Sequence, residues 1–296
     1  MNDIVLITPP TAEPVTAAQL MQQMGMGTIS DPTLSASLTA QLTAYLLTAR
    51  QDCENYCQRV FLTQHWLLRR DSFPGHNLRY EWNGYPQIEL PKPPFQSVDA
   101  FNYIDVSGAV QALTIDTTYG TNPANPEYGY QLDRGSETQA ARLLPPFARP
   151  WPPTRMVPAN VMVQFRCGYG GPITATIAAN SAVLSVANGI TFNPDDVPLL
   201  TGDTGLPISI PGAGAGGATL STFIASVDGS GNATLATAAS TTVTDVPGWA
   251  GVPVPQNILQ AILFLAQWYY EQASIVDAPM PRVVRALLDP YRNMVA

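Results

Sequence analysis

CGYG at Cys167–Gly170 and VPVP at Val252–Pro255 are the two stretches that decide the fold of this 296-residue chain. Between them the sequence is rich in Ala, Gly, Ser and Thr, and 171–246 contains no Lys or Arg. That range holds five aspartates, so it supplies five of the eight net negative charges. Such a change of composition is typical of a domain boundary. We therefore predict a discontinuous host domain, residues 1–170 plus 247–296, and an inserted domain, residues 171–246.

The chain carries few charges for its size. It is 46% hydrophobic and 12% charged, about half the charged fraction that soluble domains usually have. We therefore expect much of the surface to face other protein. The net charge of −8 argues against broad attraction to nucleic acid or anionic membranes. Lys92 is the only lysine among fourteen basic residues, and arginine suits fixed, partly buried ion pairs.

The first long helix is predicted at 32–60. Asp31 can cap it and Pro32 fits its first position. Apolar residues then recur at steps of three and four, which places them on one stripe: Leu34, Leu38, Leu42, Tyr45, Ala49, Cys53, Tyr56 and Val60. A second apolar helix is predicted from Pro255 and a short last helix from Pro281. Together these helices predict a helical bundle.

The remaining segments predict β-structure. Residues 61–167 contain alternating runs and turn signals, and Val161, Val163, Phe165 and Cys167 share one face of a strand. The range 171–246 contains short β-like runs that turn residues separate, which predicts an all-β sandwich or barrel. The fold class is therefore α+β. The longest apolar run, near Ile258–Tyr270, is too short to span a bilayer, and no signal peptide is recognisable at the N-terminus.

A search for chemistry finds no catalytic, metal or cofactor site. His65 and His76 lack metal-ligand spacing, and Cys53 and Cys57 lack the second pair that a zinc site needs. Three cysteines, with Cys167, do not make a disulfide framework, which predicts a reducing compartment. The sequence GAGAGG at Gly212–Gly217 matches a dinucleotide-binding pattern by letter, but a strand rather than a helix follows it. The acidic pair Asp195 and Asp196 lacks the spaced ligands of a calcium loop.

Three arginines lie near aromatic residues in the sequence after the long helix: Arg69, Arg70 and Arg79 with Trp66, Tyr80 and Trp82. They could stack on bases, or they could pair with acids across a subunit boundary. The acidic net charge favours the second interpretation.

Outside 171–246, four segments resemble the head–tail connector (adaptor, or head-completion) proteins of tailed double-stranded DNA phages. In order along the chain, they are LITPP…EPVT at Leu6–Thr16, ENYCQRVF…TQHW at Glu54–Trp66, FPG…IELPKPPFQSV at Phe73–Val98, and FRCGYG…VPQNILQAIL…WYYE at Phe165–Glu271. The resemblance covers about three quarters of the chain. It implies a ring, typically of twelve copies, in the virion neck, assembled in the host cytoplasm.

The resemblance also implies partners and interfaces. The ring would lie below the portal protein, extend the channel for packaged DNA without sequence-specific binding, and dock tail or nozzle proteins. The two apolar helices suit large permanent interfaces, with these candidate subunit-contact residues: Leu38, Leu42, Tyr45, Phe264 and Trp268. By analogy with the family alone, Pro290, Tyr291 and Arg292 are the candidate portal-docking residues. No membrane partner and no cofactor are expected.

A second hypothesis concerns the inserted domain. Its range Ile208–Val243 resembles β-segments of phage tail-fibre and spike proteins, which the connector pattern does not usually contain. This resemblance implies a virion protein that binds a receptor or glycan, or decorates the particle, through 171–246. A third hypothesis, an enzyme such as a glycan hydrolase, has no catalytic constellation to support it, so we expect no enzyme.

Overall fold

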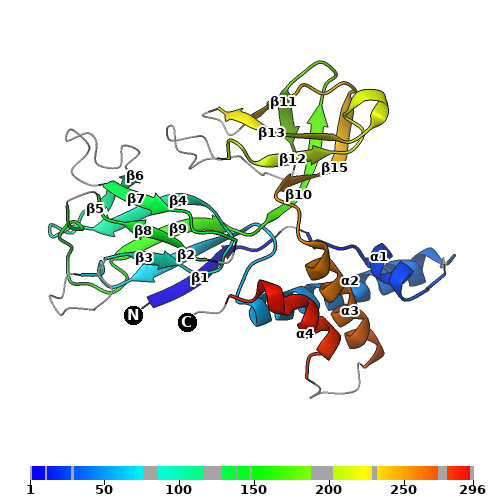
Figure 1. Cartoon of the computed structure of the whole chain (residues 1–296), viewed down its shortest axis with the longest axis horizontal. Helices are drawn as coiled ribbons and strands as arrows, with labels where there is room; N and C mark the ends of the chain where they lie inside the picture. Colours follow the sequence, from blue (N-terminus) through cyan, green and yellow to red (C-terminus); the bar gives the residue numbers. More distant parts are fainter. Residues whose placement is uncertain are drawn as a thin grey trace.

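The computed structural model describes residues 2–10, 12–27, 30–75, 86–115, 129–137, 139–146, 149–187, 203–228, 232–272 and 279–293. Their helices gather in one layer, and their strands form a five-stranded sheet, a four-stranded sheet and a closed six-stranded barrel. The barrel lies above the helices and sheets in Figure 1 and is joined to them through β10 and β15. The fold is α+β, as the sequence predicts.

The helical layer consists of α1 (Ala17–Gln23), α2 (Pro32–Cys57), α3 (Gln256–Glu271) and α4 (Arg282–Leu288). The helix α2 packs against α3, which also contacts α4 (Figure 1). The start signal of α2 acts as predicted, because the Asp31 carboxylate accepts the backbone N–H groups of Thr33 and Leu34 at 2.8 and 3.3 Å. Thr16 caps α1. Fully buried side chains join the helices into one apolar core: Leu20, Leu42, Leu46, Ala49, Cys53, Ile258, Ala261, Ile262, Leu265, Ala266, Val284 and Leu288.

The five-stranded sheet is antiparallel throughout, in the order β1-β2-β9-β4-β5. Its strands are β1 (Asn2–Thr8), β2 (Gln64–Arg70), β9 (Val161–Cys167), β4 (Phe95–Ile104) and β5 (Val110–Ala112). The predicted face of β9 is buried, because Val161, Val163, Phe165 and Cys167 are each at most 1% exposed. The strand β9 is central, and its neighbour β2 begins at Gln64, shortly after α2 ends at Cys57, so the sheet is joined to the helical layer.

The four-stranded sheet, in the order β3-β8-β7-β6, lies against the first. Its strands are β3 (Ile88–Leu90), β8 (Ala141–Leu144), β7 (Gly129–Asp133) and β6 (Thr114–Ile115). The two sheets share an apolar core in which Phe73 stacks on Trp151, with ring centroids 4.8 Å apart, and Phe101 packs edge-on against Trp151. The region 61–167 thus folds as two facing sheets.

The barrel closes in the order β10-β11-β14-β13-β12-β15. Its strands are β10 (Gly170–Ile177), β11 (Val183–Val186), β14 (Ala233–Leu235), β13 (Leu220–Val227), β12 (Pro207–Ile210) and β15 (Val243–Gly251). It has an apolar core of its own, built around Ile173, Ile177, Ile208, Ile210, Ile224 and Leu235. Between the predicted alternatives, the structure therefore selects a barrel.

Two boundaries differ from the sequence prediction. The helix predicted to reach residue 60 ends at Cys57, because Gln58 adopts a left-handed conformation (φ 53°) and the buried Glu54 carboxylate accepts the Phe61 N–H at 2.8 Å. The barrel also extends past residue 246, because β15 continues to Gly251 and pairs there with Gly170. A side chain on either glycine would collide with neighbouring backbone atoms, so both positions require glycine.

Candidate functional site

The N-terminal half of α2, Pro32–Ala49, has no charged side chain. Residues spaced by three and four form an exposed stripe, here called the uncharged face: Ala36, Ala40, Ala44 and Leu47. Threonines beside it donate their hydroxyls to backbone carbonyls four residues earlier, at 2.8–3.0 Å. Leu34 and Leu47 are 58% and 42% exposed. Approach to this face therefore requires no desolvation of an ion, and its small side chains permit close packing.

The predicted subunit-contact residues meet in the core between α2 and α3. Leu42 is completely buried within its own chain. The other four are partly buried against the same core: Leu38 and Tyr45 from α2, and Phe264 and Trp268 from α3. Tyr45 also packs edge-on against Tyr270, with ring centroids 6.2 Å apart. Leu42 thus serves the fold of the protomer, and the contribution of the other four to subunit contacts stays a prediction.

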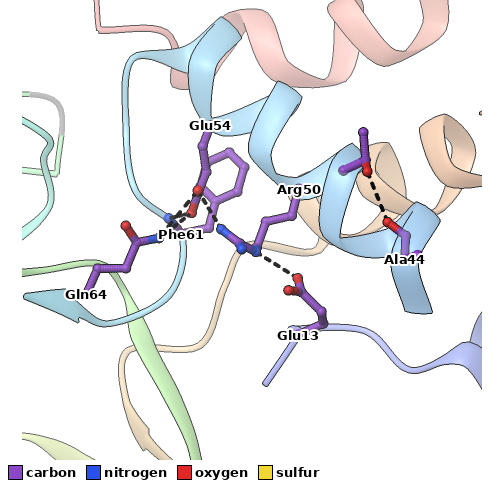
Figure 2. A network of polar contacts seen from close by, with 7 residues as sticks. Glu13, Ala44, Arg50, Glu54, Phe61 and Gln64 are labelled. Carbon is purple, nitrogen blue, oxygen red and sulfur yellow. Dashed lines mark hydrogen bonds and ion pairs between the residues drawn. The ribbon is translucent and has the colours of Figure 1, made fainter. Parts of the chain in front are cut away.

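The C-terminal half of α2 contains a buried polar network, which Figure 2 shows. The Arg50 guanidinium contacts Glu13 at 2.7 Å and Glu54 at 2.6 Å. Glu54 also accepts the Phe61 N–H and the side-chain amide of Gln64. Burial raises the pKa of Glu54, while Arg50 and both hydrogen bonds act in the opposite direction. The network ties the N-terminal segment, α2 and the start of β2 together.

The predicted portal-docking residues lie against the C-terminal end of α2. Pro290 and Tyr291 belong to the 3₁₀ turn η2 (Asp289–Tyr291), and the Arg292 guanidinium lies 4.9 Å from the centre of the Tyr56 ring. The Tyr56 hydroxyl donates to Asp289 at 2.6 Å. Asn293 donates its backbone N–H to the Cys57 carbonyl at 2.9 Å. The C-terminal segment is therefore anchored to α2.

A second polar cluster joins the barrel to the five-stranded sheet. Arg166 on β9 contacts Asp99 on β4 at 2.9 Å and Asp203, which precedes β12, at 3.1 Å. The Asp99 carboxylate also contacts His65 Nδ1 at 3.1 Å. Burial opposes ionisation of Asp99, but the hydrogen bond from His65 and the charge of Arg166 outweigh it and lower its pKa. This cluster fixes one side of the barrel against the sheet.

The other sequence candidates are buried thiols, part of a turn, or residues outside the described ranges. Cys53, Cys57 and Cys167 are buried free thiols, and burial raises the pKa of each. The stretch Gly212–Gly217 leads into β13 rather than a helix, as predicted. His76, Arg79, Tyr80, Trp82, Asp195 and Asp196 lie outside the described residues. The described residues contain no cluster of three or more potential metal ligands, and none of their helices has the length and hydropathy to cross a membrane.

Neither polar cluster was predicted from the sequence, although the sequence contains a partial signal for each. Arg50 and Glu54 are four residues apart beside an apolar stripe, a spacing that allows an ion pair on a helix. The predominance of arginine predicts buried pairs, and Arg50 and Arg166 confirm that prediction. The pairing of Arg166 with Asp203 joins strand β9 to the segment before β12, so no local pattern could have indicated it.

Neither a protein-family model nor a curated relative matches this sequence. Solved structures do match. A chain of the virion of a native gene transfer agent (GTA) particle is 16% identical, with a TM-score of 0.50 over 99% of this chain and 96% of that one. Two further matches have TM-scores of 0.48. They are chains of the neck of the native GTA particle computed with C12 symmetry and of the empty particle computed with C6 symmetry, at 17% and 16% identity, each covering 100% of this chain and 97% of the other.

The match to the virion chain spans the barrel as well as the helices and sheets, because it covers nearly the whole of both chains. The barrel therefore belongs to the fold that the two chains share. At this identity the likeness defines the fold alone.

Proposed function

We propose that this chain is a structural protein of a phage-like virion neck, where copies form a head-to-tail adaptor ring. The observation that carries the proposal is the fold shared with a GTA virion chain along almost the entire length of both proteins. The resemblance of four segments to phage connector proteins supports it independently. The role is assembly rather than catalysis, and the ring would contain twelve copies, as the connector resemblance implies.

The uncharged face of α2 supports the ring. Subunit contacts are depleted in charged residues at their centres, and α2 has none from Pro32 to Ala49. Leu38 and Tyr45 of α2 and Phe264 and Trp268 of α3 are partly buried, and they would contribute their exposed parts to the contact. A head-to-tail contact that closes on itself gives a ring. The ring would lie below the portal and extend the DNA channel, where an acidic chain avoids binding phosphates.

The test of this function is assembly. We expect purified protein, alone or with portal protein, to form closed rings in electron micrographs. A protein that stays monomeric at high concentration and binds no portal would contradict the proposal. For the docking residues, truncation after Leu288 should abolish portal binding while rings still form. Unchanged portal binding would remove Pro290, Tyr291 and Arg292 from the docking surface.

The barrel is proposed to be a separate domain of the same protein. Because Gly170 pairs with Gly251, residues 171–250 can be replaced by a short Gly-Ser linker without stretching the host. The shortened protein should fold and assemble, since the helices and sheets keep their own apolar cores. Unfolding on deletion would show that host and barrel form one cooperative unit.

The alternative function, receptor or glycan binding through the barrel, has one observation in its favour. Phe223 on β13 is 54% exposed, and Val183 on β11 is 55% exposed. Large exposed apolar side chains on a small barrel are candidate contacts for a ligand. If Phe223→Ser abolished attachment of particles to cells and left neck assembly unchanged, this second role would be supported.

A further inference from the structure

The C-terminal end of α2 gathers positive charge that is not balanced. Arg59 follows the helix, α4 contributes Arg282 and Arg285, and Arg292 follows η2. Asp289 is the carboxylate beside them, and it already accepts the Tyr56 hydroxyl. Among the residues that the structure describes, none of the four arginines forms an ion pair. Such a cluster is unusual in a chain with a net charge of −8.

Arg59 lacks a full set of hydrogen-bond partners among the described residues. Its side chain is completely buried, and Nη1 donates to the Tyr169 hydroxyl at 3.1 Å. Its Nε and Nη2 are buried without a hydrogen-bond partner in the described structure, as is the Nε of Arg285. A buried charge normally requires a partner. The carbonyl end of α2 supplies only about half a negative charge, so the deficit persists.

An open depression lies beside Arg282 and Arg285, whereas Arg59 and Arg292 do not line it. It has a volume of about 290 Å³ and is lined by Tyr56, Arg282, Arg285, Ala286 and Asp289. Guanidinium groups hold carboxylates through paired N–H donors, and the Tyr56 ring offers an apolar wall to the methylene groups of an acidic side chain. The depression therefore suits an acidic side chain, whose carboxylate Arg282 and Arg285 would hold.

We propose that this depression is a docking site for an acidic side chain of a partner protein. A carboxylate there would pair with Arg282 and Arg285, the two arginines that line the depression. Duplex DNA is the less suitable occupant. A protein that binds DNA contacts successive phosphates with a stripe of basic side chains, whereas this site is one depression on an acidic protein. The inference deepens the proposed function, on which it rests for the identity of the partner as a neighbouring virion protein.

The test uses the full chain and a fluorescein-labelled hexaglutamate peptide, followed by fluorescence anisotropy at low salt. The double variant Arg282→Ala/Arg285→Ala should lower the affinity at least about tenfold, since two charge-assisted contacts are lost. Arg69→Ala is the matched control, because Arg69 is 43% exposed on the remote strand β2; its affinity should equal that of the wild type. Arg282→Ala alone, at an exposed position, provides a second variant if the double variant unfolds.

Two outcomes would overturn the proposal. One is equal peptide binding by the wild type and the arginine variants. The other is tighter binding of a 12-base-pair duplex than of the peptide, with the same loss on substitution, which would make this a phosphate site. Electron micrographs of the same samples separate this inference from the function. Rings without peptide binding remove only the docking site, and arginine-dependent peptide binding without rings removes only the proposed ring.

Discussion

The two halves of α2 differ in almost every physical respect. The N-terminal half is uncharged, and its outer face consists of small exposed side chains. The C-terminal half buries Arg50 and Glu54 in a network that includes Glu13, Phe61 and Gln64. Both halves belong to one continuous helix of 26 residues. The difference shows that one end of a helix can organise its own chain while the other end stays available to a partner.

The buried polar residues of α2 lie where the chain turns from the helix toward β2. A buried ion pair is weak evidence of added stability, because desolvation offsets much of the attraction. It does fix geometry, since either group left alone would be buried and uncompensated. The network therefore fixes the direction in which the chain leaves α2 and enters β2. Within the protomer, the side chains of the uncharged face are not constrained in this way.

The largest effect is expected at Glu54. Glu54→Ala leaves the Arg50 guanidinium without one carboxylate and the Phe61 N–H without an acceptor, so the free energy of unfolding should fall by about 3–5 kcal/mol. Chemical denaturation followed by circular dichroism measures the change. Glu54→Gln, which keeps an acceptor, should cost less. A loss below about 1 kcal/mol for the alanine variant would mean that the network does not organise the C-terminal half.

Thiol reactivity gives the next largest contrast between the halves. Burial raises the pKa of Cys57 to about 12 and also raises that of Cys53. A cysteine introduced by Ala40→Cys lies on the exposed uncharged face. At pH 8, iodoacetamide should modify it at least about 100-fold faster than Cys53 in the monomer, because thiolate fraction and access control the rate. Mass spectrometry of the peptides reports both sites.

The same variant tests the partner of the uncharged face. In assembled rings, the Ala40→Cys thiol should become protected from iodoacetamide. Unchanged labelling between monomer and ring would place the subunit contact elsewhere on the molecule.

A charge on the uncharged face should affect assembly more than stability. Ala40→Arg keeps a good helix former, so the free energy of unfolding should change by less than about 0.5 kcal/mol. Ring formation should weaken by about tenfold or more, since a buried charge would lack a partner. Mass photometry across a dilution series measures it. Gln51→Arg, at an exposed position of the other half, is the control and should assemble normally.

The smallest effect is expected at the start of α2. Asp31→Ala removes the acceptor for the Thr33 and Leu34 N–H groups, which should lower stability by about 1 kcal/mol. Asp31→Asn, which can still cap the helix, should remain close to the wild type. Thermal unfolding compares the variants. A loss well above 1 kcal/mol would indicate that the N-terminal half is packed more firmly than its exposure suggests.

Local signals in the sequence predicted the features that depend on near neighbours. Asp31 and Pro32 located the start of α2, and the alternation Val161–Cys167 identified β9 and its buried face. The predicted end of α2 was wrong, because the Glu54 carboxylate accepts the Phe61 N–H and turns the chain after Cys57. Hydrophobic periodicity gives no sign of that contact.

The longer-range features could not be predicted in this way. The strands β10 and β15 contain Pro172, Pro247 and several glycines, which resemble turn signals until the strands are paired. The candidate docking depression needs residues from α2, α4 and η2, and Tyr56 is far in sequence from Arg282, Arg285 and Asp289. Their juxtaposition follows from tertiary packing alone.

The pairing of β10 with β15 has a mechanical consequence. Both chain crossings into the barrel run through this two-stranded ribbon, which continues from β9 of the sheet and leads into α3 (Figure 1). Arg166 and Asp203 brace the barrel at a separate point. A torque applied to the barrel is thus delivered to the sheet and to the helical layer together. The barrel is therefore held to the rest of the molecule at two points, the paired strands at Gly170 and Gly251 and the Arg166–Asp203 ion pair.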